Sequence, residues 1–334
     1  MATPVMEKTE MVFIDKAFVL ENLPWDPLIL AMENALRIFS DTKNNTAEEQ
    51  VLQPSIFCSR WLGVMPAAIT TPDKDILATK LVTVYPENGA KSLPSHHAII
   101  VLFDCTSGSI KAVLDGEVIT EKRTAAVSAV AAKYLASTSR TVLAVLGSGV
   151  QGKAHIEAFL HLFKDIKQVR IWNHRAEGAE NLAGKMRVLY PDVEIVACES
   201  VELAVSSANM IVTATSSKTP ILHHSHVQPG TFIAAVGAPR KDWREMSPEL
   251  VAKSVLIVDS VDAATVEAGD IVCTPNAKIC AEIGQVLGQQ VVPRLLGNRT
   301  PEDVVIFKSL GLALEDAAAA DLVYREFVRK CKKT

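Results

Sequence analysis

The segment from Thr141 to Arg175 constrains the fold of this chain more than any other feature. An apolar run, Thr141–Leu146, is followed by a glycine-rich turn, a segment of helical periodicity and a second apolar run, Gln168–Trp172. Continuous aliphatic and β-branched runs are typical of parallel strands that are buried on both faces. The turn reads Gly147-Ser148-Gly149-Val150-Gln151-Gly152 and matches G-x-G-x-x-G, the pattern of a dinucleotide-binding turn.

Each glycine of this turn has a physical reason. The first permits a tight turn, the second lets the backbone approach a pyrophosphate, and the third lets helix and strand pack closely. The phosphates then lie at the helix N-terminus. The alternative is a glycine turn in another α/β protein, but the strand–turn–helix–strand context favours a dinucleotide site. The residues expected to contact the cofactor here are Gly147, Gly149, Val150, Gln151 and Gly152.

The end of the second strand indicates which cofactor is used. An NAD site usually has an Asp or Glu there, which accepts a hydrogen bond from the ribose 2′-hydroxyl. This chain has Asn173, His174 and Arg175 instead. Positive charge and hydrogen-bond donors suit a 2′-phosphate, so we expect these residues to bind the cofactor and to favour NADPH, with NADH as the second choice. The alternative is a solvated arginine at a strand end.

After Arg175 the alternation of strand and helix patterns continues. Six buried strands joined by helices predict an α/β fold with a Rossmann-type doubly wound parallel sheet. Beyond Pro301, the segment Val304–Lys330 is expected to be one long helix. The strands expected besides Thr141–Leu146 and Gln168–Trp172 are Val193–Cys198, Asn209–Thr215, Thr231–Val236 and Val255–Asp259.

The first third of the chain has different patterns. Trp25–Ser40 has apolar residues at helical spacing, and Ile119–Ala136 is an alanine-rich helical segment. Between them, from Trp61 to Asp115, strand patterns dominate, and Asp104–Ser109 has the turn residues of a hairpin. We therefore expect a second, α+β domain with a mostly antiparallel sheet.

Composition excludes several classes of function. The net charge of −4, without a long run of like charge, does not favour nucleic acid or an acidic membrane as partner. No apolar run approaches the length of a membrane span. Three histidines, His223, His224 and His226, are too close together in a loop to converge on a metal, so no metal is expected. The cysteines lack any C-x-x-C pair and fit reduced thiols of a cytoplasmic protein. They are Cys58, Cys105, Cys198, Cys273, Cys280 and Cys331.

Over almost its full length the chain resembles the ornithine cyclodeaminase/mu-crystallin family. The family implies a substrate-binding and dimerisation domain at residues 1–124 and 304–334, a Rossmann NAD(P)-binding domain at 125–303, and a homodimer. The segments that carry the resemblance are Leu62–Ala67 (LGVMPA), Thr79–Pro86 (TKLVTVYP), Leu93–Ala98 (LPSHHA), Leu114–Ala129 (LDGEVITEKRTAAVSA), Val169–Asn173 (VRIWN), Pro239–Glu245 (PRKDWRE) and Ile306–Asp316 (IFKSLGLALED).

The resemblance implies an oxidoreductase that uses NAD(P)H to reduce cyclic ketimines to cyclic amino acids. Its substrates would be imine-2-carboxylates such as piperideine-2-carboxylate, pyrroline-2-carboxylate and sulfur-containing ketimines. One alternative is an ornithine cyclodeaminase or amino-acid dehydrogenase, but the absence of a carboxylate at Asn173–Arg175 disfavours an NAD-preferring enzyme. The other is a binding protein of the crystallin type, which binds thyroid hormone in an NADPH-dependent manner.

When the functional residues of the family are matched to this sequence one by one, the resemblance implies two catalytic residues. Lys80, in ATKLV, matches the carboxylate-binding lysine, and Asp242, in PRKDWRE, matches the catalytic aspartate that holds or relays the imine proton. Arg123 would be a second anion contact, toward the substrate carboxylate or a cofactor phosphate. The alternatives are surface charges for Lys80 and Arg123, and a helix cap for Asp242.

Further positions match the cofactor site and the substrate pocket of the family. Glu267, in TVEAGD, matches a position implicated in amino-acid or hormone binding, with an exposed helical Glu as the alternative. The positions that match the family's cofactor-lining residues are Ser95, His96, Thr215 and Ser309.

Two departures from the family pattern concern anion binding. Family members have an arginine two residues after the Gln-Pro pair that is here Gln53-Pro54, where this chain has Ile56. Ile56 cannot bind a carboxylate, and Arg60 would substitute only from a shifted register. The second departure is His174 at the position of a family arginine, with Arg175 one place later.

Overall fold

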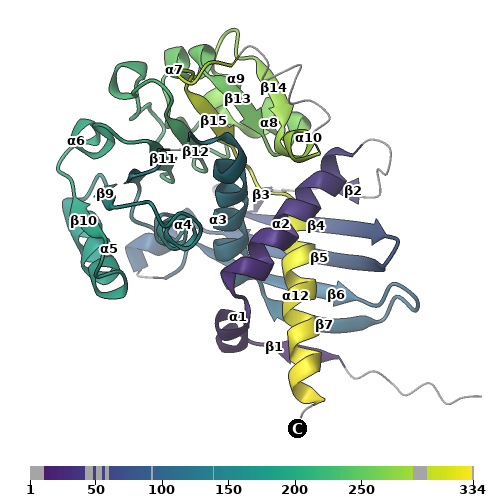
Figure 1. Ribbon diagram of the computed structural model, residues 1–334. Coiled ribbons are helices and arrows are strands. Elements are labelled where there is room, and N and C mark those ends of the chain that lie inside the picture. Colours follow the sequence, from purple (N-terminus) through teal and green to yellow (C-terminus); the bar gives the residue numbers. More distant parts are fainter. Residues whose placement is uncertain are drawn as a thin grey trace, which may run out of the picture. The chain divides into compact units, whose positions relative to one another are not determined.

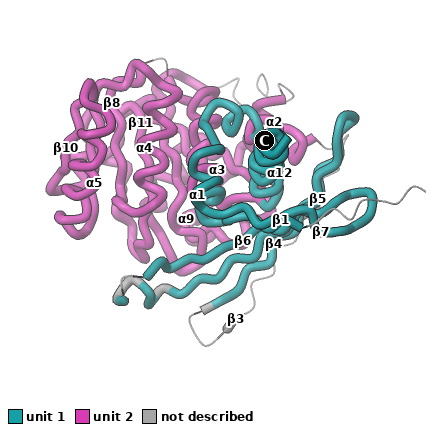
Figure 2. The backbone as a smooth tube through the Cα atoms, turned by 90° about the horizontal axis from the view of Figure 1, so that it is seen from below, with its two compact units in different colours: residues 1–31, 44–120, 313–334 teal, residues 32–43, 121–312 magenta. Residues whose placement is uncertain are grey.

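The computed structural model describes residues 11–41, 48–49, 55–56, 60–91, 93–137, 139–288 and 299–332 (Figure 1). The chain forms two compact units, shown in different colours in Figure 2. It passes between them four times, and two of these passages fall within helices, α2 (Trp25–Ser40) and α3 (Gly116–Leu135). Unit 1 comprises Met1–Ala31, Asn44–Thr120 and Ala313–Thr334, and unit 2 comprises Met32–Lys43 and Glu121–Leu312.

Unit 1 is built on a mostly antiparallel sheet, as expected. Its described strands follow the spatial order β1-β7-β6-β5-β4-β2, and β3 also pairs with β4. The pair of β1 and β7 is parallel. The hairpin turn between β6 and β7 lies at Asp104–Ser109, where it was predicted. The strands are β1 (Val12–Ile14), β2 (Glu48–Glu49), β3 (Ser55–Ile56), β4 (Arg60–Thr71), β5 (Lys74–Val84), β6 (His96–Phe103) and β7 (Ile110–Asp115).

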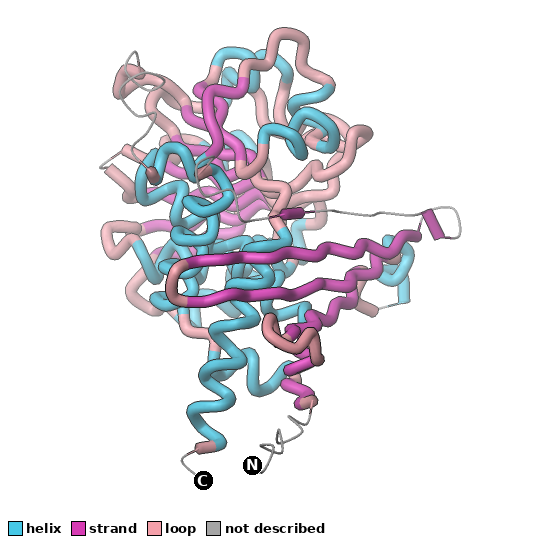
Figure 3. The backbone as a smooth tube through the Cα atoms, turned by 90° about the vertical axis from the view of Figure 1, so that its right-hand side faces the viewer, coloured by secondary structure: helices cyan, strands magenta, loops and turns pink. Residues whose placement is uncertain are grey.

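Helices cover one face of this sheet. Both α1 (Lys16–Asn22) and α12 (Ala313–Cys331) lie on that face (Figure 2), and α12 contacts β4, β5 and β6. Side chains alternate between the faces along each strand. On β5 the covered face therefore receives Lys80 and Val82, while Leu77 on the opposite face is exposed. Figure 3 shows the strands of the sheet side by side across the front of the view.

Unit 2 contains the doubly wound parallel sheet that the sequence predicts. Among the described residues its eight strands follow the order β10-β9-β8-β11-β12-β15-β13-β14, and all are parallel. Six were predicted, and β14 and β15 were not. The strands are β8 (Val142–Leu146), β9 (Gln168–Trp172), β10 (Glu194–Ala197), β11 (Met210–Thr213), β12 (Phe232–Ala235), β13 (Val255–Val258), β14 (Ile279–Glu282) and β15 (Val305–Lys308).

Helices join these strands. The connections are α4 (Val150–Leu162), α5 (Ala176–Leu189), α6 (Val201–Val205), α7 (Pro248–Lys253), α8 (Val261–Glu267), α9 (Gly269–Val272) and α10 (Ile283–Leu287), with a short 3-10 helix, η2 (His224–His226).

The expectation of one long helix at Val304–Lys330 is wrong at its start. Residues 305–308 form β15, which lies between β12 and β13 and is buried along its whole length. A run of β-branched and aromatic residues favours a buried strand over a helix. The chain then turns at Gly311, whose φ of +89° suits glycine, and α12 begins at Ala313. The last segment of unit 1 consequently starts at Ala313 and not at residue 304.

Two further observations concern membrane-spanning helices and cysteines. No helix in the described part of the chain is both long enough and apolar enough to cross a membrane. The cysteines among the described residues are free thiols, whereas Cys58 lies outside these residues.

Candidate active site

The carboxyl ends of the parallel strands of unit 2 gather most of the predicted site residues on one edge of the sheet. The strand order reverses between β8 and β11, because β8 continues to β9 on one side and the later strands lie on the other. Ligands of open α/β sheets bind at such a switch point. The predicted residues that follow strand ends in unit 2 are the glycine turn after β8, Asn173–Arg175 after β9, Thr215 after β11, Asp242 after β12 and Ser309 after β15.

The glycine turn has the backbone that a pyrophosphate site requires. Gly147 has a φ of +117°, and a Cβ atom there would collide with the Ala214 carbonyl oxygen. A Cβ on Gly152 would collide with the Gly147 carbonyl oxygen, whereas a Cβ on Gly149 would meet nothing within 4 Å. Gly149 is the N-cap of α4 and provides no side-chain cap. The first turn of α4 thus has no side-chain cap and has open space beside Gly149, so it fits a dinucleotide phosphate.

The end of β9 lies directly beside this turn. The Gly147 N–H donates to the Trp172 carbonyl oxygen at 2.8 Å. Asn173 Nδ2 donates to the Arg175 carbonyl oxygen at 3.1 Å. Because His174 and Arg175 are both exposed next to the turn, the imidazole ring and the guanidinium group are accessible to an anionic ligand.

Ser309 is held by a buried carboxylate that sequence reasoning missed. Its hydroxyl donates to Asp259 Oδ2 at 3.2 Å, and the backbone N–H groups of Leu310 and Gly311 donate to the same oxygen at 2.6 and 2.7 Å. Burial raises the pKa of Asp259. Asp259 thereby fixes the backbone against which Arg123 lies, since a Cβ on Gly311 would collide with the Arg123 guanidinium. Arg123 is only 4% exposed, which excludes the surface-charge alternative.

Asp242 lies on an exposed loop between β12 and α7. Its side chain pairs with Arg240 at 3.3 Å and is 55% exposed. The loop packs closely on Gly269, where a Cβ would collide with the carbonyl oxygens of Arg240 and Trp243. The helix-cap alternative is wrong, because α7 is capped by the Ser247 side chain.

Glu267 ends helix α8 and is half-buried. Burial and the neighbouring Asp259 raise the pKa of Glu267, while Lys241 opposes the shift. Its carboxyl group is therefore more readily protonated than that of an exposed helical Glu.

In unit 1 the structure places Lys80, Ser95 and His96 near one another. Lys80 is 3% exposed, and its Nζ lies 2.5 Å from Asp316 Oδ2 of α12. Burial therefore excludes the surface-charge alternative for Lys80. Ser95 Oγ lies 2.8 Å from His96 Nδ1, and desolvation together with the charge of Lys80 lowers the pKa of His96. Sequence reasoning missed Asp316 as the partner of Lys80.

A second buried charge cluster lies under the carboxyl edge of the unit 2 sheet. We call Glu245, Asp270 and Lys308 the buried triad; all three are fully buried or nearly so. Lys308 Nζ lies 3.5 Å from Asp270 Oδ2 and donates to the Gly237 carbonyl oxygen. Burial raises the pKa of Glu245 to about 7, an effect that Lys308 opposes and Asp270 reinforces. Lys308 is recognisable in the sequence because it ends an apolar run, whereas no sequence pattern distinguishes Glu245.

His155 connects helix α4 to helix α3. Its Nε2 lies 2.9 Å from Ser128 Oγ, and its Nδ1 lies 2.7 Å from the Gln151 carbonyl oxygen, which only accepts. Nδ1 therefore carries the proton and Nε2 accepts from the hydroxyl. Burial lowers the pKa of His155 to about 4, so the ring is neutral near neutrality.

We expect this histidine to make stability depend on pH. An unfolded histidine has a pKa of about 6.5, so between pH 6.5 and 4 the unfolded state binds the extra proton and stability falls by about 1.4 kcal/mol per pH unit of acidification. His155→Gln cannot titrate and keeps both hydrogen bonds. Denaturant unfolding should show that its stability deficit at pH 7 shrinks at pH 5. A deficit that is the same at both pH values would contradict the assignment.

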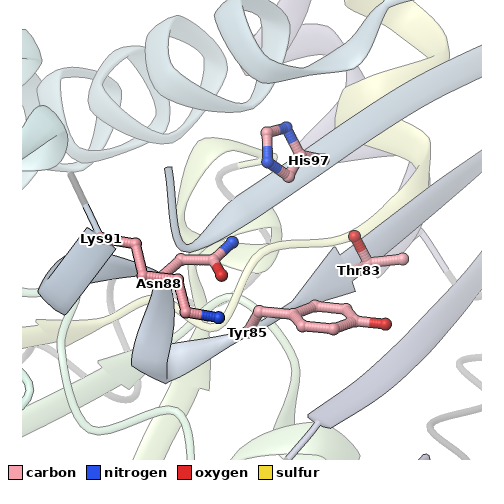
Figure 4. A pocket seen from close by; sticks show the side chains of 5 residues that line it. All are labelled: Thr83, Tyr85, Asn88, Lys91 and His97. Atoms are coloured by element: carbon pink, nitrogen blue, oxygen red, sulfur yellow. The ribbon is translucent and has the colours of Figure 1, made fainter. Parts of the chain in front are cut away.

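An open pocket lies elsewhere in unit 1. Its volume is about 430 Å³, and Figure 4 shows its polar lining. None of the predicted site residues lines it. Thr83 and His97 are cross-strand neighbours on the sheet face opposite Lys80. This pocket is therefore separate from Lys80 and its partner Asp316. The lining residues are Thr83, Tyr85, Asn88, Lys91 and His97.

The remaining predictions concern metal and the departure from the family arginine. In the described ranges no group of His, Cys, Asp or Glu side chains is arranged to hold a metal ion. The rings of His223 and His226 pack edge to face at 5.2 Å. Gln53 and Pro54 lie outside the described residues, and only the backbone of Ile56 and Arg60 is described, as paired residues of β3 and β4.

Comparisons with known proteins show which family the chain is similar to. The model of the ornithine cyclodeaminase/mu-crystallin family matches residues 9–331. Ketimine reductase mu-crystallin of Rattus norvegicus is 44% identical over 301 residues, which are 89% of this chain and 91% of that protein.

Two solved structures are similar along nearly the whole chain. The Delta(1)-pyrroline-2-carboxylate reductase of Thermococcus litoralis, in complex with NADH and L-proline, has a TM-score of 0.89 at 28% identity and covers 96% of this chain and 98% of its own. An archaeal alanine dehydrogenase dimer with bound NAD has a TM-score of 0.86 at 26% identity, with 96% and 97% covered.

Proposed function

The chain belongs to the ornithine cyclodeaminase/mu-crystallin family, and we propose that it is an NAD(P)H-dependent reductase of cyclic ketimines. The substrates are imine-2-carboxylates with five- or six-membered rings, including sulfur-containing rings, and the products are cyclic amino acids. The observation that carries the proposal is the carboxyl edge of the unit 2 sheet. There the glycine turn, Thr215 and the loop of Asp242 follow neighbouring strands at the switch point. A relative at 44% identity is a ketimine reductase.

The residues of the chain have separate tasks in this reaction. The bound cofactor supplies a hydride to the imine carbon. The glycine turn and the first N–H groups of α4 hold its phosphates. Lys80 supplies the cation for the substrate carboxylate, sharing its charge with Asp316. Asp242 holds the proton on the imine nitrogen, which makes the carbon a better hydride acceptor.

The experiment that tests this function is direct. Purified protein is mixed with NADPH and a panel of five- and six-membered cyclic imine-2-carboxylates, and loss of NADPH absorbance is followed. We expect turnover with at least one ring size and no oxidation without the imine. Binding of NADPH and thyroid hormone without any turnover would instead favour the binding-protein alternative. Release of ammonia from ornithine with NAD would favour a cyclodeaminase.

We further propose that NADPH is preferred over NADH. The support is the exposed pair His174 and Arg175 beside the glycine turn, in a strand end without a carboxylate. A cytoplasmic location stays a prediction from the sequence.

Arg175→Ala should weaken NADPH binding by about 1–3 kcal/mol, because a charge-assisted contact with the 2′-phosphate is lost. NADH has no such phosphate, so its affinity should hardly change. Fluorescence titration with both cofactors measures the two losses. Lys185→Ala, which removes another exposed cation of α5, is the control and should affect neither cofactor. Equal losses for NADPH and NADH in Arg175→Ala would refute the contact.

The partner of the protein is proposed to be a second copy of the chain. On the face of the unit 1 sheet opposite α12, apolar side chains lie in cross-strand rows such as Ile99–Leu81–Val64. Phe13 on this face is 66% exposed, and Ile99 is 39% exposed. Contiguous exposed apolar surface on a sheet face favours association. The archaeal alanine dehydrogenase of similar fold is a dimer.

Ile99→Lys should therefore convert the dimer to monomers. Burying an ammonium in an apolar interface costs several kcal/mol, which raises the dissociation constant by roughly a hundredfold or more. Sedimentation velocity over a range of concentrations measures the change. Val188→Lys is the control, since Val188 is 80% exposed on α5 of unit 2. A dimer of unchanged stability in Ile99→Lys would exclude this face.

A further inference from the structure

The turn after β11 supports the glycine turn from behind. The carbonyl group of Ala214 and the methyl group of Thr215 pack directly against Gly147, where they leave no room for a Cβ. The Ala214 N–H also donates to the Leu146 carbonyl oxygen at 2.8 Å. A displacement of Ala214 and Thr215 would therefore displace the backbone that faces the cofactor phosphates.

Glu245 holds this supporting turn in place. The Thr215 N–H donates to Glu245 Oε1 at 2.6 Å, and the Thr213 hydroxyl donates to Oε2 at 2.7 Å. Both carboxyl oxygens are thus bonded to the end of β11. A Cβ on Gly237 would collide with this carboxyl group and with the Thr215 carbonyl oxygen, so the close approach requires glycine.

Glu245 also stands at the end of the loop that carries Asp242, and Asp270 fixes the backbone there. The backbone N–H groups of Glu245 and Met246 donate to Asp270 Oδ1 at 2.8 and 3.0 Å. Asp242 lies between this anchor and the end of β12, three residues before Glu245. One residue therefore connects the loop of the expected catalytic aspartate to the support of the glycine turn.

The hydrogen bonds of Glu245 do not depend on its charge. The groups that face it are Lys308 of β15, Asp270 of α9 and the two threonines at the end of β11. With all three members of the buried triad ionised, the cluster has a net negative charge, which proton uptake by Glu245 removes. A neutral carboxyl can donate from Oε2 to the Thr213 hydroxyl and still accept the Thr215 N–H at Oε1, so side-chain length matters more than charge.

We propose that Glu245 is a positioning residue for both the cofactor turn and Asp242. Its side chain holds the Thr215 N–H, and its backbone, fixed by Asp270, ends the loop that carries Asp242. The effect on Asp242 rests on the proposed function, whereas the effect on the cofactor turn requires only that the protein binds NADPH.

Two variants of opposite character test this proposal. Glu245→Gln keeps the length of the side chain and loses the charge, with its amide oxygen accepting from Thr215 and its amide group donating to Thr213. Glu245→Asp keeps the charge and loses the length. We expect Glu245→Gln to bind NADPH within roughly threefold of the wild type, and Glu245→Asp to bind at least roughly tenfold more weakly, because the contact with Thr215 is lost. Thermal unfolding and circular dichroism check that both variants fold.

Hydrogen exchange gives a second readout that does not involve turnover. The amide of Thr215 should exchange faster in Glu245→Asp and at nearly the wild-type rate in Glu245→Gln. The opposite order in NADPH affinity, or equal affinities for the two variants, would overturn the proposal. Both readouts need only NADPH and the folded protein. If the protein binds NADPH but reduces no ketimine, the proposed function is refuted, and the two Glu245 variants still test the positioning role of Glu245.

Discussion

Lys80→Met lowers kcat/KM for a cyclic ketimine by about two to three decades. The expected loss follows from removing one partner of a desolvated charge pair, which costs about 2–5 kcal/mol. Lys80 is buried on the covered face of the unit 1 sheet, where its ammonium is screened little by water. NADPH affinity, measured by fluorescence, should stay within a few-fold of the wild type because the glycine turn is untouched.

Lys80→Met also breaks the ion pair with Asp316, so this variant changes stability as well as activity. Methionine removes from the buried Asp316 carboxylate the ammonium that neutralises it, and loss of a partner in a buried pair destabilises by about 3–5 kcal/mol. The double variant Lys80→Met with Asp316→Asn removes that buried charge. We expect the double variant to unfold at a higher temperature than Lys80→Met and to remain inactive.

Lys74→Met is the matched control for this experiment. Lys74 lies on the same strand and pairs with Asp321 of the same helix, but its side chain is 42% exposed. Pairs between exposed side chains contribute little, so its loss should change activity and stability only slightly. Near-normal turnover in the double variant would remove Lys80 from substrate binding.

Elements defined by local pattern were predictable from the sequence. Helix α2 has the predicted bounds, Trp25–Ser40, because its apolar spacing is regular along its whole length. The glycine turn was found because three residue positions and their context are fixed by backbone geometry. In contrast β15 was missed, because a run of four buried residues directly before a helical pattern has no periodicity of its own.

Partners that meet through the tertiary fold were not predictable in the same way. The lysines at 80 and 308 are recognisable as unusual within apolar runs, but the sequence does not show that Asp316 and Asp270 neutralise them. Glu245 shows the same limit. Its role depends on hydrogen bonds to the end of β11, a strand that is distant in sequence and becomes adjacent only when the parallel sheet forms.

Asp242→Asn separates charge from shape at the expected catalytic position. Hydride adds to a protonated imine far more readily than to a neutral one, because electron density moves to nitrogen in the transition state. A carboxylate beside that nitrogen stabilises the protonated substrate and contributes about two decades or more. The amide keeps the size of the side chain and lacks the charge. We therefore expect normal folding, normal NADPH affinity and a loss of roughly two or more decades in kcat/KM.

The ion pair between Asp242 and Arg240 requires a control of its own. The side chain of Asp242 pairs with Arg240 at 3.3 Å, so loss of that ion pair is a second explanation for reduced activity in Asp242→Asn. Arg240→Gln removes the pair and leaves the carboxylate. If the carboxylate acts on the imine, Arg240→Gln keeps activity within a few-fold of the wild type, since exposed ion pairs contribute little to stability.

The pH profile then identifies what the carboxylate does. In Asp242→Asn no side chain at this position favours the protonated imine, so the residual kcat/KM should rise toward acid pH, where the free substrate takes up a proton from solvent. The wild type should show a flatter profile over the same range, because its carboxylate maintains the protonated form to higher pH. Both profiles are measured from mildly acid to mildly alkaline pH with the same ketimine. A variant whose rate and profile match those of the wild type would show that Asp242 has no role in the chemistry.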